Sequence, residues 1–206
     1  MSERGNTSDS LQSGTEPPWQ SVLDFWFLPP AAPGFGEVRS EWFRKDPTFD
    51  EAIREQFGGL IEAALGGALD HWDIKTRGAL ARIIVLDQFT RNLFRNTARA
   101  FAGDAQALSA ARALVDTASD RALPPVERWF VYMPFEHAED IVMQERAITL
   151  FTALEADSKL DNLVGYAVRH RDIIARFGRF PHRNRMLDRA STPDEIEFLK
   201  QPGSGF

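Results

Sequence analysis

The sequence predicts an all-α fold, an array of about eight helices packed as antiparallel hairpins. Apolar residues recur at spacings of three and four along most of the chain, and proline or Ser/Thr/Asp start signals precede the apolar runs. Strand-type alternation is scarce. For a mass of 23.2 kDa, folding buries roughly 70% of the surface that the unfolded chain exposes. We therefore expect a single helical domain with its own core over residues 17–206.

The N-terminal region precedes the first expected helix. Residues 1–16 are polar and rich in Ser, Gly and Thr, so they predict a disordered tail and not a signal peptide. Pro17 and Pro18 favour a helix start, and a short helix through Val22 to Phe27 follows. No uncharged apolar stretch is long enough to span a membrane. We expect a cytoplasmic protein, because a signal peptide and cysteines are both absent.

Three helices are expected in the middle of the chain. Asp46 and Pro47 begin a helix whose apolar residues share one face and which ends at Gly66. Positions 74–90 carry a second apolar stripe. Positions 100–118 are rich in alanine, which favours a third helix.

The last part of the chain predicts four more helical segments. Pro124 opens one, and Pro134 is expected to interrupt it. A long helix is expected from about 136 to 155. The next helix is expected to end at Gly178 as a C-terminal cap, and Thr192, Pro193 and Glu195 form a capping-box pattern before the last one.

Charge is distributed unevenly along the chain, whose net charge is −6. Seven arginines and two acids lie between Arg169 and Arg189, whereas six acids and one arginine lie between Glu136 and Asp157. Consecutive helices usually pack against each other. Either the two windows pair with each other, or their charges converge on a pocket. The acidic average and the lack of a DNA-binding motif make nucleic acid an unexpected partner.

The first charged motif is LDQFTRNLFR at 86–95. On a helix, Asp87, Arg91 and Arg95 are four positions apart and share one face. They either form a solvated ion pair or line a pocket, since arginines set among phenylalanines bind carboxylate or phosphate well when partly buried. Asn92 lies in the same segment.

The second motif is YMPFEHAED at 132–140. Pro134 would begin a helix whose first-turn acids suit the helix dipole. His137 and Asp140 are three positions apart, a spacing that can orient an imidazole as a general base. One histidine and one aspartate are too few ligands for a metal, and no cofactor-binding motif occurs, so we expect neither a metal nor a cofactor.

The third motif is HRDIIARFGRFPHRN at 170–184. Its first part lies on a helix, where Asp172 can pair with Arg176 four positions later. Its second part, after Gly178, is expected to be a loop held by rigid helices. That loop is either a functional loop or an ordinary basic surface loop.

Together with VLDFWF at 22–27, these motifs resemble the bacterial domain-of-unknown-function family 924. The resemblance covers about residues 19 to 200. It implies a single all-helical domain related to tetratricopeptide-repeat folds, which form a right-handed superhelix. It implies no activity, because the family is uncharacterised. Thr90 departs from the family pattern, which more often has proline at this position.

The leading functional hypothesis is a polar Arg/His/Glu pocket that binds a small anionic ligand. The expected ligand-binding side chains are Asp87, Arg91, Asn92, Arg95, Tyr132, Arg179, His182, Arg183 and Asn184, with Trp26 and Trp42 as apolar walls. One alternative is a protein- or peptide-interaction scaffold. Another is a small-molecule hydrolase in which His137 or His170 is the general base and Glu136 or Asp172 orients it.

Overall fold

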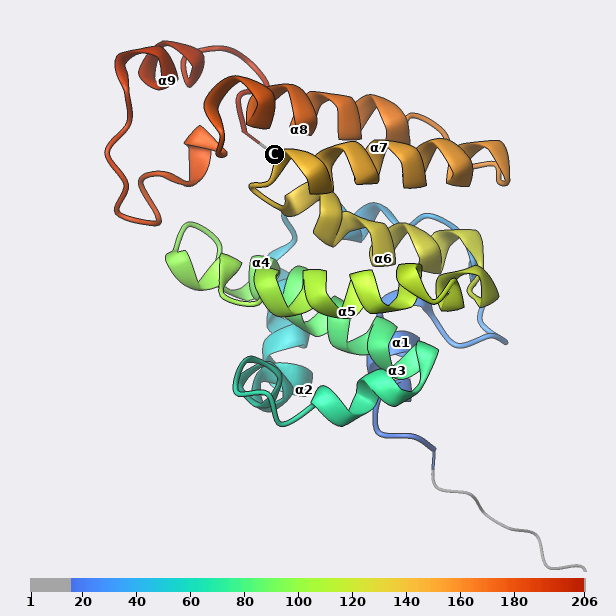
Figure 1. Cartoon of the computed structure of the whole chain (residues 1–206). Helices are drawn as coiled ribbons and strands as arrows, with labels where there is room; N and C mark the ends of the chain where they lie inside the picture. The colour runs from blue at the N-terminus through green and yellow to red at the C-terminus, as the bar shows by residue number, and fades with distance from the viewer. Residues whose placement is uncertain (1–15, 206) are drawn as a thin grey trace, which may run out of the picture.

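The computed structural model describes residues 16–205, and the regular secondary structure within them is entirely helical, without strands (Figure 1). The predicted all-α class is confirmed. The α-helices are α1 (Gln20–Phe27), α2 (Pro47–Leu65), α3 (Thr76–Ile83), α4 (Thr90–Leu93), α5 (Asp104–Asp116), α6 (Pro125–His137), α7 (Ile141–Ala156), α8 (Leu163–Phe177) and α9 (Pro193–Phe198). The predicted tail lies, apart from Glu16, outside the described residues. None of the helices in residues 16–205 is both long and apolar enough to cross a bilayer.

The second half of the described chain is a stack of antiparallel helices. Figure 1 shows α5, α6, α7 and α8 side by side, with the chain running in opposite directions in successive helices. Each helix of this series packs against the next. The predicted antiparallel hairpins are therefore present here, because short connections return the chain along the helix just completed.

Local capping signals set several helix ends as predicted. The Asp46 side chain accepts hydrogen bonds from the first turn of α2, which begins at Pro47. Thr192 and Glu195 form a reciprocal capping box at the start of α9. Gly178 ends α8 in the left-handed region, with φ of 69°.

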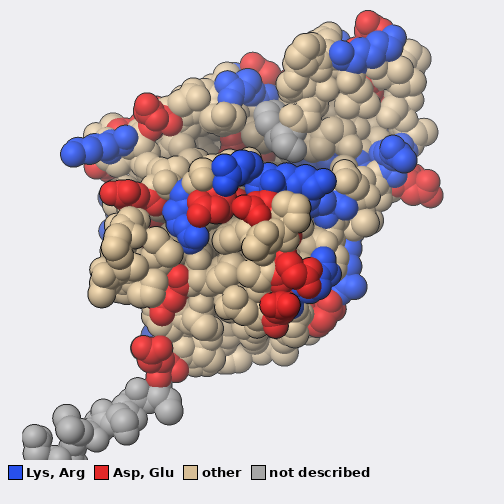
Figure 2. Space-filling view, turned by 180° about the vertical axis from the view of Figure 1, so that it is seen from behind, with Lys and Arg blue, Asp and Glu red and all other residues tan. Residues whose placement is uncertain are grey.

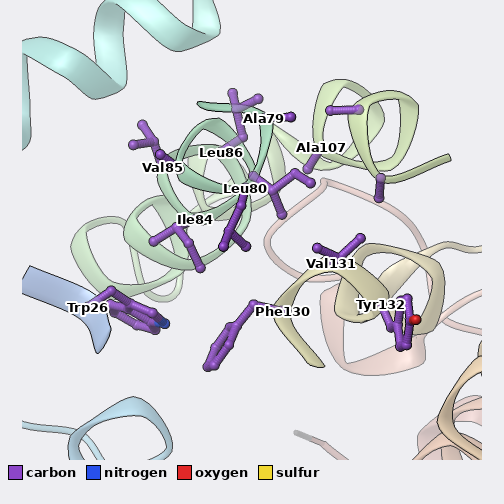
Figure 3. Packing of buried hydrophobic residues seen from close by; sticks show 14 of the residues in the cluster. Trp26, Ala79, Leu80, Ile84, Val85, Leu86, Ala107, Phe130, Val131 and Tyr132 are labelled. Atoms are coloured by element: carbon purple, nitrogen blue, oxygen red, sulfur yellow. The ribbon is translucent and has the colours of Figure 1, made fainter. Parts of the chain in front are cut away.

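Aromatic side chains form much of the main core. Trp26 stacks on Trp42 with ring centres 5.9 Å apart, and Phe130 of α6 meets Trp42 edge-on at 4.8 Å. The indole Nε1 of Trp42 donates to the carbonyl oxygen of Trp26 at 3.0 Å. Figure 3 shows Trp26 and Phe130 pointing toward each other beside Leu80 and Ile84. Both Trp26 and Trp42, which were expected to line a ligand pocket, belong to the packed core.

Two expected helix boundaries also differ from the structure. Pro134 lies inside α6 and does not interrupt it; the helix continues to His137. The next helix begins at Ile141 and not near position 136, because Asp140 is its N-cap and accepts from Val142 N at 2.7 Å. A proline one turn before a helix end forfeits a single backbone hydrogen bond, which packing readily offsets.

The expected helix over 74–90 is divided into different helical forms. A 3₁₀ turn at Asp70–Ile74 precedes α3, and a buried π-helical stretch at Ile84–Phe89 joins α3 to α4. Gly103, just before α5, lies against this stretch: a Cβ there would be 2.2 Å from the carbonyl oxygen of Leu86. Only glycine permits this approach, which brings the start of α5 directly onto the π-helical stretch. Such stretches often occur at functional sites.

Candidate functional site

Parts of the three sequence motifs meet in one buried polar group, which we call the histidine–arginine cluster. Its residues come from the π-helical stretch, α4, α5, the end of α6, α8 and the 3₁₀ turn Pro181–Arg183. Its members are Asp87, Arg91, Asp104, Glu136, His137, His170, His182 and Arg183.

Asp87 lies at the centre of this cluster and is fully buried. Its Oδ1 is 2.7 Å from His137 Nδ1 and 3.0 Å from Arg91 Nη1, and its Oδ2 accepts from Gln88 Nε2 at 2.5 Å. Burial alone would raise the pKa of this carboxyl group. Arg91 and His137 outweigh burial and hold the pKa of Asp87 well below its usual range. Asp87 is therefore ionised at neutral pH.

His137 is oriented by that carboxylate. Burial and the nearby charge of Arg91 lower the pKa of His137, and the opposing attraction of Asp87 does not compensate. The imidazole is therefore neutral at pH 7, with its Nδ1 proton donated to Asp87. Its Nε2 forms no hydrogen bond with the residues that the structure describes. This is the arrangement that a general base requires.

Arg91 and Arg183 share one carboxylate, that of Asp104 at the start of α5. Arg91 Nη1 lies 2.8 Å from Asp104 Oδ1, and Arg183 Nη1 lies 3.2 Å from Oδ2. Both guanidinium groups lie over the ring of Phe101, at 5.7 and 4.7 Å from its centre. Burial and the charge of Arg91 lower the pKa of Arg183 to about 10. The two like charges therefore oppose each other in a poorly hydrated site.

Each of these arginines keeps one buried donor without a hydrogen bond. Arg91 Nη2 and Arg183 Nε are both inaccessible to solvent and have no partner within residues 16–205. A buried donor of this kind costs about 1–3 kcal/mol, and more when the group is charged. Both donors belong to the histidine–arginine cluster.

Two further imidazoles complete the cluster. His170 Nδ1 lies 3.0 Å from Glu136 Oε1 and 2.9 Å from the carbonyl oxygen of Tyr166. The rings of His137 and His170 are 6.4 Å apart. Burial, followed by the charge of Arg183, lowers the pKa of His182 to about 4. The expected hydrolase pairing is thus revised: His170 faces Glu136, but His137 faces Asp87.

The loop after α8 is held in place by Glu139. Its carboxylate accepts from Arg189 at 2.6 and 2.9 Å and from the backbone N–H of Phe180 at 2.8 Å. A second pair, Arg171 with Glu145 at 2.8 Å, joins α8 to α7. The acidic window (136–157) and the basic window (169–189) therefore pair with each other in part. Arg183 instead binds Asp104 in the histidine–arginine cluster. Figure 2 shows acidic and basic side chains adjoining one another in a band across one face.

Four of the expected ligand-binding residues lie in other polar groups. Asn92 Nδ2 and Arg95 Nη2 both donate to Asp50 Oδ1 of α2, at 2.8 and 3.0 Å. The face expected to join Asp87, Arg91 and Arg95 does not form, because α4 ends at Leu93.

Arg179 and Asn184 bind Glu195 instead of the cluster. Arg179 forms two hydrogen bonds to the Glu195 carboxylate, at 2.7 and 2.8 Å, and Asn184 Nδ2 donates to it at 3.3 Å. Arg179 and these contacts hold the pKa of Glu195 down at about 2. A surface pocket of about 420 Å³ adjoins this pair between the end of α8 and α9. It does not contain the histidines of the cluster.

Two other expected site residues also lie elsewhere. Tyr132 donates its hydroxyl hydrogen bond to Asp120 at 2.5 Å inside the core. Asp172 is exposed and binds its neighbour Arg171 at 2.8 Å, so it neither orients His170 nor pairs with Arg176.

The sequence motifs did not indicate that Asp104 pairs with Arg91 and Arg183, or that Glu139 pairs with Arg189. Asp104 has a local signal in retrospect, because it follows Gly103, whose close packing on the π-helical stretch fixes the start of α5. Glu139 and Arg189 have no local signal, since 50 positions separate them.

The fold and this cluster define an all-helical protein with a buried, carboxylate-supported histidine–arginine site. The chain belongs to the family described as "Bacterial protein of unknown function (DUF924)", whose family model matches residues 22–203. It is similar to a solved structure from Agrobacterium tumefaciens, the protein of unknown function ATU0120. The two are 38% identical with a TM-score of 0.77, over 88% of this chain and 96% of that one. No curated protein matches the chain.

Proposed function

We propose that the histidine–arginine cluster binds a small anionic ligand. The observation that carries this proposal is the pair of buried donors without hydrogen bonds, Arg91 Nη2 and Arg183 Nε. Guanidinium groups bind the oxygens of carboxylates and phosphates through charge-assisted hydrogen bonds. An oxyanion between the two arginines would satisfy both donors.

The charges of the site support the same proposal. Arg183 shares the Asp104 carboxylate with Arg91, which also binds Asp87 at 3.0 Å. The lowered pKa of Arg183 reflects the cost of keeping this cation buried beside Arg91. A bound anion offsets that cost. It also favours protonation of His137 and His182, whose pKa values are lowered in the unliganded site, so binding is expected to strengthen as the pH falls.

Isothermal titration calorimetry with inorganic phosphate tests the proposal. We expect Arg183→Met and Arg91→Met to weaken binding by at least tenfold, since a hydrogen bond to a charged group contributes about 1.5–3 kcal/mol. Arg179→Met is the matched control, because that side chain binds Glu195 outside the cluster. The proposal is wrong if the unaltered protein fails to bind phosphate. It is equally wrong if Arg179→Met weakens binding as much as Arg183→Met does.

The peptide-scaffold alternative has one observation in its favour. Phe43 is 53% exposed and stacks on Trp129 at 5.0 Å, which leaves an aromatic surface uncovered by residues 16–205. This surface does not involve the charged motifs, so it is the weaker candidate. The tetratricopeptide-like superhelix and the cytoplasmic location stay predictions.

A further inference from the structure

The residues after α9 turn back toward the histidine–arginine cluster, and we call residues 201–205 the strap. Gly203 has φ of 76°, in the left-handed region that glycine adopts readily. Beyond this turn, Gly205 lies against His182: a Cβ at Gly205 would be 3.5 Å from the Cβ of His182. We propose that the strap is a gate, which covers the cluster at His182 and must lift before an anion reaches the buried arginine donors. This inference rests on the anion binding proposed above.

The two buried donors require that some part of the protein moves. Arg91 Nη2 and Arg183 Nε are inaccessible to solvent in the structure. An anion therefore reaches them only after a segment around the cluster has opened. Segments that open and close over a ligand site are drawn from the least stable parts of a fold, where few contacts must be broken.

The 3₁₀ turn that carries Arg183 is held by contacts across the fold. Asp104 of α5 binds Arg183 at 3.2 Å. The Arg183 guanidinium also lies over the rings of Phe101 and Phe180, at 4.7 and 4.5 Å from their centres. Glu139 accepts from the backbone N–H of Phe180 at 2.8 Å. Moving this turn would break all of these contacts, so it is an unfavourable route for an anion.

The strap, by contrast, has only local hydrogen bonds within the described residues. Gln201 N donates to the carbonyl oxygen of Phe198 at 3.0 Å. Ser204 donates from N to the carbonyl oxygen of Gln201 at 3.3 Å, and from Oγ to that of Leu199 at 3.2 Å. Most of the strap is exposed. Lifting it from His182 therefore disturbs less of the fold than moving a helix that forms the cluster.

His182 connects the strap with the arginine side of the cluster. Its ring lies 5.7 Å from that of Phe180, over which the Arg183 guanidinium also lies. Burial, followed by the charge of Arg183, lowers the pKa of His182 to about 4, as expected for an imidazole covered from water. His182 directly precedes Arg183 in the chain, so lifting the strap uncovers the side of the cluster on which Arg183 lies.

A reversible disulfide tests the gate, because the chain has no cysteine of its own. The 3.5 Å between the two Cβ positions is within the range that a disulfide bridges. We expect His182→Cys/Gly205→Cys to bind inorganic phosphate at least tenfold more weakly when oxidised than when reduced, by isothermal titration calorimetry. Both forms lack the His182 imidazole, so the comparison isolates the position of the strap. Gly205→Cys alone is the control, and its affinity should not respond to the reductant.

A second variant opens the strap without changing a cluster residue. Gly203→Ala places an alanine in the left-handed region, which disfavours the turn that closes the strap. Because a closed strap limits the fraction of protein that can bind, we expect phosphate affinity to rise by about fivefold. Gly36→Ala is the matched control and should leave the affinity unchanged. Gly36 has φ of 79°, and no atom lies within 4 Å of an added Cβ at either glycine.

Phosphate binding by the unaltered protein separates this inference from the function on which it rests. If phosphate binds in an Arg183-dependent way but the oxidised and reduced double variants bind it equally, the gate is overturned and the binding proposal stands. Tighter binding by the oxidised form also overturns the gate, because the strap would then complete the site. So does a Gly203→Ala protein that binds phosphate no more tightly than the unaltered protein. If neither of these two proteins binds phosphate, both proposals fail.

Discussion

Asp87 Oδ1 lies 2.7 Å from His137 Nδ1, although 50 positions separate the two residues in the chain. The pair joins the π-helical stretch at Ile84–Phe89 to the last turn of α6. Because Asp87 also binds Arg91 at 3.0 Å, one carboxylate connects the imidazole with the arginine side of the cluster. Both the stability of this region and its proposed anion binding depend on that carboxylate.

We expect Asp87→Ala to lower the free energy of unfolding by about 3–5 kcal/mol, because it leaves the buried charge of Arg91 without this partner. Asp87→Asn should cost less, since its amide oxygen can still accept the hydrogen bond from His137. Urea denaturation of both variants at pH 7 measures the difference. Equal losses for the two variants would show that the hydrogen bond to His137 contributes nothing.

Stability should fall as the solution is acidified from pH 6.5 to pH 4. The folded-state pKa of His182 is about 4 against an ordinary value of 6.5, so in this window the unfolded chain binds a proton that the folded chain does not. The contribution is fully present above pH 6.5 and is lost as the pH falls, by up to about 3 kcal/mol. His137 acts in the same direction, because its pKa is also lowered.

Urea denaturation at pH 7, 6, 5 and 4 checks this dependence. His182→Asn should flatten the dependence between pH 6.5 and 4, since asparagine does not titrate. The surrounding charges that set the shift, Arg183 first among them, stay in place in that variant. An unchanged slope in His182→Asn would contradict the prediction.

Trp42→Ala should lower the free energy of unfolding by about 3–5 kcal/mol, because it removes a buried ring that packs on Trp26 and Phe130. Phosphate affinity at a temperature where the variant is folded should not change, since Trp42 lies in the core and not in the cluster. Phe43→Ala, at the adjacent exposed position, is the comparison and should cost much less. A stable Trp42→Ala protein that has lost phosphate binding would restore the pocket-wall role for this residue.

Gly103→Ala should disturb the fold and the cluster together. Its Cβ would lie 2.2 Å from the carbonyl oxygen of Leu86, so the start of α5 must move away, at a cost of about 3 kcal/mol. Asp104 moves with it, and phosphate binding should weaken. Gly59→Ala is the matched control, because nothing lies within 4 Å of the added Cβ in α2. That change should stabilise the protein by about 1 kcal/mol. If Gly103→Ala keeps its phosphate affinity, the position of the start of α5 does not affect phosphate binding.

The amino-acid sequence by itself determined the helical class, several helix ends and the family. These features depend on local physics: the cap at Asp46 and the capping box from Thr192 to Glu195 act within one turn of the chain. Apolar spacing is likewise a local property, so it predicted most helices. It did not anticipate that Pro134 lies within α6, because packing decides whether a lost backbone bond is tolerated.

Only the tertiary structure decided which charged side chains work together. The sequence predicted one pocket containing Arg91, Arg95, Arg179 and Arg183. In the structure, Arg95 binds Asp50 and Arg179 binds Glu195. It also paired histidines with carboxylates on their own helix segments. Charges exert their strongest effects between groups in contact, and contacts such as that of Asp87 with His137 join distant positions. The packing of the π-helical stretch, α5 and α6 therefore determined which residues form the site. Local patterns of residue spacing do not predict that packing.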